Sequence, residues 1–104
     1  MVKEASSTTQ NVKIQIELFG LARIKSGIRV VEVDVPSVTN VGEVAKVLSE
    51  NCPVLLGLAI LEDKTALQPS YTFNLNGTEF LADGEEIHLE RGDSLLLFSS
   101  QAGG

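Results

Sequence analysis

Residues 95–98, an unbroken apolar run of three leucines followed by Phe98, constrain the fold most strongly. A strand with one face in water alternates apolar and polar residues, whereas a strand covered on both faces carries a continuous apolar run. We therefore predict that residues 95–98 form a strand in the middle of a sheet. Its most economical neighbour is the first strand of the chain, paired with it in parallel.

The amino-terminal part of the domain contains two alternating segments. Residues 12–18 alternate apolar and polar side chains with a period of two, which predicts a half-buried strand. Residues 28–35 alternate as well. Their apolar residues stand at even positions at the start, Ile28 and Val30, and at odd positions from Val31 onward, which predicts a bulge near Val30 and Val31. Residues 21–27 are expected to be a loop, so the two segments are predicted to form a hairpin.

One main helix is predicted between Pro36 and Pro53, since proline ends regular structure on both sides. The side chains able to cap its first turn precede it: Ser37, Thr39 and Asn40. Apolar residues then recur at helical spacing, at Val41, Val44, Ala45 and Leu48. This pattern predicts a helix that buries one face.

The second half contains several short strands. Residues 53–69 are compatible with either a strand or a short helix. Residues 71–75 are predicted to be a strand, followed by an Asn76-Gly77 turn and a return at residues 78–81. Residues 86–90 alternate again. Together the elements predict an α+β fold of the β-grasp type, a roll in which one main helix packs across a mixed sheet of about five strands.

These elements define one domain at residues 12–98, which fits a chain of 104 residues. The polar residues 1–11 are expected to be a flexible lead-in. Residues 99–104 are expected to be a flexible tail that ends in Gly103 and Gly104.

The acidic composition excludes some classes of partner. The net charge is −6, whereas binding of nucleic acid or of an anionic membrane calls for a basic patch, so we expect neither partner. An acidic surface serves either solubility or steering toward a basic protein. Residues 1–11 do not resemble a secretory signal, and no apolar run reaches transmembrane length, so a cytoplasmic location is expected.

Residue types that carry catalysis or bind metals are scarce. Cys52 is the only cysteine, which excludes an internal disulfide and a multi-cysteine metal site, and we expect it to be a small buried apolar residue. His88, the only histidine, lies on a different predicted element. No pattern pairs the carboxylates of Asp34, Glu43, Glu62 and Asp63 across a pocket. We expect no metal, no bound cofactor and no catalytic side chain.

The Gly103-Gly104 pair has a chemical interpretation. Glycine has no Cβ, so two terminal glycines form a thin strip of backbone that ends in an unhindered carboxylate. Such a tail can thread a narrow channel and place its carboxylate against the α-phosphate of ATP in another protein. The pair arises by chance in about 0.5% of chains at ordinary glycine usage.

The sequence resembles the ubiquitin-like sulfur carriers, and in particular the MoaD family, which is the small subunit of molybdopterin synthase. The resemblance covers residues 13–104 and rests on three motifs, at residues 18–23, 74–77 and 89–98 before the Gly-Gly end. The last motif is the most specific. Where the family often has two prolines after the last strand, this chain has Ser99 and Ser100.

The resemblance implies a function for the end of the chain. An adenylating enzyme of the ubiquitin-activating type would use ATP to convert the Gly104 carboxylate to an acyl-adenylate. Sulfur from a donor persulfide would displace AMP and leave a thiocarboxylate. The large subunit of molybdopterin synthase would then receive the tail and pass the sulfur to the precursor of molybdopterin.

In this scheme the chain has no catalytic residues of its own. Gly104 is the reacting group and Gly103 gives access to it. Ala102 and Gln101 are held in the channel of the partner, and Phe98 contributes to the partner interface. ATP belongs to the adenylating enzyme.

Three alternatives share parts of this pattern. One is a carrier of the ThiS type, which donates sulfur for the thiazole of thiamine. Another is a ubiquitin-like protein modifier, in which activated Gly104 forms an isopeptide bond with a lysine. The third is a β-grasp interaction module that binds without chemistry at its terminus.

Overall fold

The computed structural model describes residues 10–99. The predicted lead-in, apart from its last two residues, and the predicted tail beyond Ser99 lie outside this range. The elements follow in chain order: β2 (Asn11–Leu18), α1 (Gly20–Ser26), β3 (Val30–Pro36), β4 (Val38–Thr39), α2 (Val41–Asn51), the 3-10 helix η1 (Pro53–Leu55), β5 (Tyr71–Leu75), β6 (Glu79–Phe80), β7 (Ile87–His88) and β8 (Ser94–Ser99).

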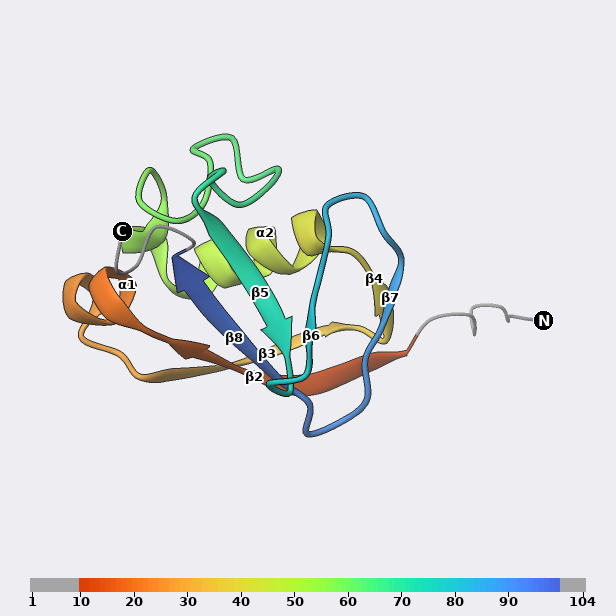
Figure 1. Ribbon diagram of the computed structural model, residues 1–104. Coiled ribbons are helices and arrows are strands. Elements are labelled where there is room, and N and C mark those ends of the chain that lie inside the picture. Colours follow the sequence, from red (N-terminus) through yellow and green to blue (C-terminus); the bar gives the residue numbers. More distant parts are fainter. Residues whose placement is uncertain (1–9, 100–104) are drawn as a thin grey trace.

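A five-stranded mixed sheet organises the molecule, in the order β3-β2-β8-β5-β6 (Figure 1). The last strand, β8, lies between β2 and β5. It is parallel to β2, with Ile16 opposite Leu95, and antiparallel to β5, with Phe73 opposite Leu97. The other neighbours, β2–β3 and β5–β6, are antiparallel. The predicted central position and parallel pairing of the last strand are therefore confirmed.

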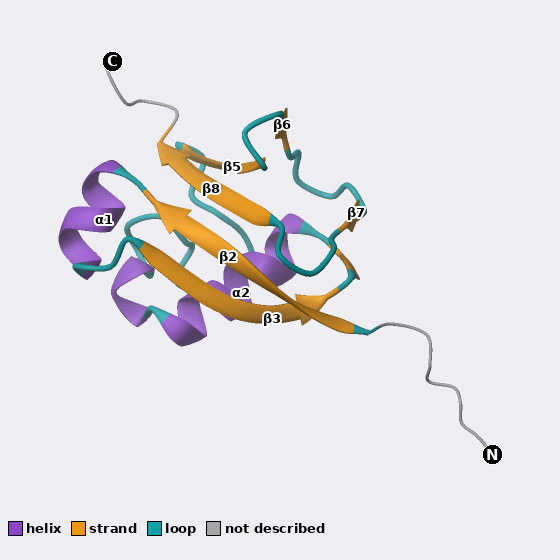
Figure 2. Ribbon diagram, turned by 90° about the horizontal axis from the view of Figure 1, so that it is seen from below, coloured by secondary structure: helices purple, strands orange, loops and turns teal. Residues whose placement is uncertain are grey.

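Helix α2 packs against one face of this sheet (Figures 1 and 2). Asn40 caps it, because its Oδ1 accepts a hydrogen bond from the Glu43 amide at 2.9 Å. The Thr39 hydroxyl donates to the Glu43 carboxylate at 2.8 Å and fixes the same turn. The apolar side chains between helix and sheet have no exposed surface: Ile14, Ile16, Leu18, Val35, Val44, Leu48, Phe73, Leu95 and Leu97.

The connection between β2 and β3 differs from the prediction. Residues 21–27 were expected to be a loop, but Gly20–Ser26 form the helix α1. Ala22 is fully buried and anchors this helix to the core. Gly27, with a φ of 73°, ends it by donating its amide to the Arg23 carbonyl at 2.9 Å. The β2–β3 pair is antiparallel as predicted, but a helical turn joins its strands.

The predicted bulge near Val30 and Val31 is absent. The register between β2 and β3 is continuous, with Val30 opposite Glu17 and Val31 opposite Ile16. The strand begins at Val30, so Ile28 belongs to the preceding loop. Val30 itself is 41% exposed, on the same face as Glu32 and Asp34, so the change of parity reflects an exposed valine and not a bulge.

The prediction that both faces of the last strand are covered is wrong. Leu95 and Leu97 are fully buried under α2, whereas Leu96 and Phe98 point to the opposite face and are only half-buried. Among residues 10–99, no helix lies over that second face (Figure 2). The continuous apolar run is therefore made of two core residues, Leu95 and Leu97, that alternate with two apolar surface residues, Leu96 and Phe98.

The remaining segments are short. Residues 53–69 contain η1 and then irregular structure held by isolated bridges, such as Ile60 with Leu67. The Asn76-Gly77 turn is present, with both residues at positive φ. Residues 86–90 reduce to the two-residue β7, which pairs with β4 in a separate small sheet. None of the helices formed by residues 10–99 has the length and apolar character needed to cross a bilayer.

Candidate functional site

The candidate site lies where the chain leaves the sheet at Ser99, at the end of β8. Four of the predicted site residues lie outside the described range: Gln101, Ala102, Gly103 and Gly104. The fifth, Phe98, is the penultimate residue of β8. Phe98 and its surroundings are therefore the part of the predicted site that the structure describes.

Phe98 is the centre of an aromatic cluster. Its ring stacks on that of Phe19, with centroids 4.9 Å apart and planes at 9°, and lies 6.3 Å from the ring of Phe80 at 58°. Phe19 is the residue that precedes α1, and Phe80 belongs to β6. The cluster thus joins three elements that are distant in the sequence. Such aromatic pairs contribute about 0.5–1.5 kcal/mol each beyond their buried area.

The strand register explains why these rings share one face. Glu17 pairs with Leu96, and Phe19 follows Glu17 by two residues, as Phe98 follows Leu96. Side chains two positions apart along a strand share a face. All four therefore lie on the face opposite α2.

We call Phe19, Phe80, Leu96 and Phe98 the aromatic surface. The Phe80 side chain is 65% exposed, and the other three are half-buried. Clustered exposed apolar side chains mark an interaction surface, whereas scattered ones do not. This arrangement can bind a complementary apolar surface at the base of the tail.

Asn74 is a polar residue within this surface. It lies opposite Leu96 on one neighbouring strand and opposite Phe80 on the other, and it is only 5% exposed. Its Oδ1 atom is buried and accepts no hydrogen bond from any described residue. Buried polar atoms are nearly always paired, so this oxygen costs stability.

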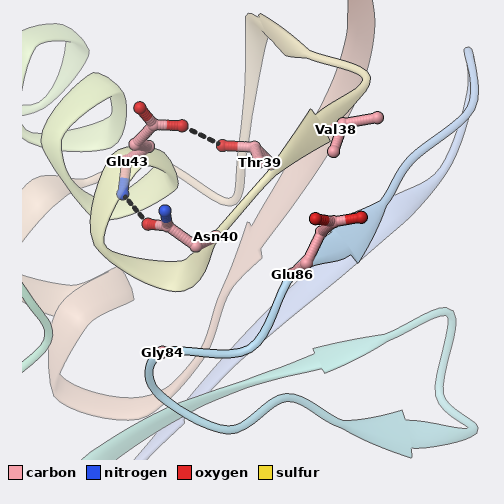
Figure 3. A pocket seen from close by; sticks show the side chains of 6 residues that line it. All are labelled: Val38, Thr39, Asn40, Glu43, Gly84 and Glu86. Atoms are coloured by element: carbon pink, nitrogen blue, oxygen red, sulfur yellow. Dashed lines mark hydrogen bonds between the residues drawn. The ribbon is translucent and has the colours of Figure 1, made fainter.

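A surface depression lies between β4, the start of α2 and the segment 84–86 (Figure 3). It has a volume of about 270 Å³ and is lined by Val38, Thr39, Asn40, Glu43, Gly84 and Glu86. The hydrogen bonds that Thr39 and Asn40 make with Glu43 serve the cap of α2. Glu86 is exposed, and its carboxylate lies 2.9 Å from the Nε2 atom of His88, which is also exposed. These polar groups are explained by local structure.

Residues 10–99 bring together no group of three histidine, cysteine or acidic side chains that could hold a metal ion. The carboxylates considered from the sequence are exposed; Asp34, for example, pairs with Lys13 at 3.5 Å. Cys52 is buried at the end of α2, as expected. Burial raises the pKa of its thiol, and a hydrogen bond with the Ser26 side chain offsets part of that rise.

The same architecture occurs in several solved structures. Small archaeal modifier protein 1 from Haloferax volcanii is 29% identical to this chain, with a TM-score of 0.72 over 88% of this chain and 99% of the other. The HVO 2177 protein of the same organism is 26% identical, with a TM-score of 0.66 over 90% and 88% of the two chains. A protein described as molybdopterin converting factor subunit 1 from Pyrococcus furiosus is 20% identical, with a TM-score of 0.61 over 85% and 97%.

The fold is the ubiquitin-like β-grasp. The predicted fold class is thereby confirmed. The sequence matches no family model and no curated protein sequence. At 20% identity the similarity to the Pyrococcus protein concerns the fold alone.

Sequence reasoning found Phe98 but missed Phe19, Phe80 and Asn74. The signal for Phe19 was its position two residues after Glu17, because residues two apart share a face and Glu17 lies on the polar face of the first strand. Phe80 carried no signal, because its strand has only two residues and its position depends on pairing with β5.

Proposed function

We propose that this chain is a ubiquitin-like carrier whose terminal glycine, Gly104, is activated by an adenylating enzyme in another protein. The observation that carries the proposal is the aromatic surface around Phe98, five residues before Gly103 in the sequence. A partner that binds this surface holds the base of the tail. It can then position the terminal carboxylate without help from any side chain of the carrier.

The chemistry follows from a free carboxylate. Its oxygen attacks the α-phosphate of ATP, pyrophosphate leaves, and an acyl-adenylate forms at Gly104. The terminal sulfur of a donor persulfide displaces AMP and forms an acyl disulfide with the donor. A second thiol then attacks the sulfur on the donor side, which leaves a thiocarboxylate at Gly104 and a disulfide on the donor. Gly103 keeps the approach narrow, Ala102 and Gln101 occupy the channel, and ATP is bound by the partner.

For the fate of the sulfur we propose molybdopterin synthesis, with the large subunit of molybdopterin synthase as the acceptor partner. The sequence motifs that resemble the MoaD family support this choice, and the most specific of them, residues 89–98, contains most of β8. The Pyrococcus protein described as a molybdopterin converting factor subunit shares the fold only.

A second candidate is protein modification, in which activated Gly104 is joined to a lysine of a target protein. The 29% identity to small archaeal modifier protein 1 favours it, since that chain is covered over 99% of its length. The two candidates share the adenylation step and differ in the nucleophile that follows.

The shared step is tested by intact-mass spectrometry of the chain ending at Gly104, after incubation with the adenylating enzyme of its source organism, ATP and a sulfur donor. Wild type and Cys52→Ala should both exchange one terminal oxygen for sulfur. Deleting Gly104 withdraws the carboxylate by about 3.3–3.6 Å and should abolish the exchange. A misplacement of about 1 Å already costs about a hundredfold in a positioned reaction.

Gly104→Val is the matched variant, because it keeps the length of the tail and adds a branched side chain that should block the channel. Sulfur on Cys52, or normal loading of the deletion variant, would exclude terminal activation. The acceptor is tested separately. The loaded protein should yield molybdopterin with the large synthase subunit and precursor, whereas a modifier should instead form lysine conjugates.

A further inference from the structure

The segment that contains α1 is basic in an otherwise acidic protein. Residues 19–31 contain Arg23, Lys25 and Arg29 and no acidic residue, although the chain has a net charge of −6. All three side chains are exposed. In the part of the chain from residue 10 to residue 99, none of them forms a salt bridge with a carboxylate.

The same helix exposes large apolar side chains. Ile24 is 75% exposed and Leu21 is 48% exposed. They are three residues apart, so they are neighbours on the surface of α1. We call Leu21, Arg23, Ile24, Lys25 and Arg29 the α1 surface. Apolar groups flanked by cations that pair with no carboxylate of residues 10–99 match a partner that offers carboxylates around an apolar contact.

The α1 surface lies beside the point where the chain leaves the sheet. Phe19, which precedes α1, stacks on Phe98 at 4.9 Å, and both Figure 1 and Figure 2 show α1 next to the carboxyl ends of β2 and β8. Seven residues of helix extend about 10 Å. Helix α1 therefore begins directly after a residue that contacts Phe98.

A partner that holds Gly104 must approach this end of the molecule. Residues 100–104 add at most about 18 Å of extended chain beyond Ser99. A standard protein interface covers about 800 Å² and about 20–30 residues on each partner, whereas the aromatic surface has four residues. Such a footprint around the base of the tail includes α1.

We propose that the α1 surface is a second docking surface, which binds an acidic and partly apolar patch on the enzyme that activates the tail. The proposal rests on the proposed function and names the chemistry of the partner. The opposite end of the protein supports it. Residues 83–93 contain five acidic residues and one arginine, and β7, within this segment, lies at the end away from α1 (Figures 1 and 2).

This distribution of charge orients the encounter. An acidic patch is attracted to the α1 surface and repelled by residues 83–93, so the end of the carrier that bears α1 faces the enzyme before contact. The apolar contacts of Leu21 and Ile24 then hold the complex after the charges have aligned it.

The test measures binding of the full chain to the purified adenylating enzyme of the source organism, by calorimetry without ATP. The double variant Arg23→Glu/Lys25→Glu should raise Kd by about tenfold or more, since it places like charges opposite the patch. The matched control, Lys46→Glu/Arg91→Glu, makes the same change of charge on exposed side chains elsewhere and should leave Kd within about threefold. Wild-type binding should weaken as salt is added, and the α1 variant should lose most of this dependence.

Ile24→Ser tests the apolar part and should weaken binding at every salt concentration. Equal loss of affinity in the α1 variant and the control, or a wild-type affinity that is insensitive to salt, would overturn the proposal. So would a wild-type chain that does not bind the enzyme. ATP–pyrophosphate exchange separates the two hypotheses. If the α1 variant weakens binding but wild type supports no ATP–pyrophosphate exchange, the proposed function is wrong and the docking surface stands. If exchange occurs but binding does not respond to the charge changes on α1, the docking surface is wrong and the proposed function stands.

Discussion

Asn76 accepts a hydrogen bond from the backbone amide of Ser94 through its Oδ1 atom, at 2.8 Å. Its Nδ2 atom donates to the Asp93 carboxylate at 3.1 Å. Asn76 also has a φ of 56°, in the left-handed region that the turn after β5 requires. One side chain thus stabilises the β5–β6 turn and fixes the start of β8.

Two substitutions separate these roles of Asn76. Asn76→Gly keeps the backbone conformation but removes both hydrogen bonds, and should lower the free energy of unfolding by about 1–2 kcal/mol. Asn76→Ala removes the same bonds and adds the strain of a left-handed alanine, so it should cost about 1 kcal/mol more. Urea denaturation measures both. Equal costs would show that the conformation of the turn carries no strain.

Gly42→Ala should destabilise the protein, although alanine usually stabilises a helix. A Cβ atom at Gly42 would lie 2.5 Å from the Thr65 carbonyl oxygen, where backbone must move to make room. Overpacking of this kind costs about 1–3 kcal/mol, against a gain in helix propensity of about 1 kcal/mol.

Lys46→Ala, at an exposed position of the same helix, is the control for Gly42→Ala and should change stability by less than about 0.5 kcal/mol. A Gly42→Ala protein with a higher melting temperature than wild type would show that the backbone around Thr65 can move away from the added Cβ without loss of stability.

Cys52 should make stability fall at alkaline pH. Burial raises the pKa of its thiol above the ordinary value of 9.0. Below pH 9 the thiol is protonated in both the folded and the unfolded chain, so its contribution is complete. As pH rises through 9 only the unfolded chain loses the proton, which favours unfolding until the folded pKa is reached.

The measurement for Cys52 is the urea midpoint of wild type and Cys52→Ala between pH 7 and pH 10. Wild type should lose more stability than the variant across the upper part of this range. Parallel curves would mean that the thiol titrates normally in the folded protein.

The phenylalanines should divide into structural and binding residues. Phe73 is fully buried, and Phe73→Ala should cost about 3–5 kcal/mol in urea denaturation. Phe98 is half-buried and its loss should cost about 1–3 kcal/mol. Phe80 is 65% exposed, so Phe80→Ala should cost less than about 1 kcal/mol and still slow adenylation. If Phe80→Ala is adenylated at the wild-type rate, the aromatic surface is not part of the interface with the adenylating enzyme.

The sequence was sufficient to predict the features that depend on local patterns. The helix at α2 followed from the spacing of Val44 and Leu48 between two prolines, and the turn followed from Asn76-Gly77. The position of β8 followed from its apolar run. Each of these signals lies within a few residues of the element that it predicts.

The features that were missed depend on contacts between distant segments. Helix α1 has no side-chain cap and is held by Ala22 in the core. The apolar run of β8 could not distinguish a second buried face from an exposed surface, because that depends on whether a helix covers Leu96 and Phe98. The aromatic surface required the pairing of β6 with β5, which no local pattern revealed.

The central position of β8 has a consequence for how the protein is made. Ile16 pairs with Leu95, so β2, near the start of the chain, cannot complete its pairing until β8, near the end, has been synthesised. During synthesis the sheet has a gap in its middle until β8 emerges from the ribosome, and a chain released before that point lacks the strand that joins β2 to β5. A ribosome that stops before Ser99 therefore releases a chain with an incomplete sheet, and that chain also lacks every residue that follows β8.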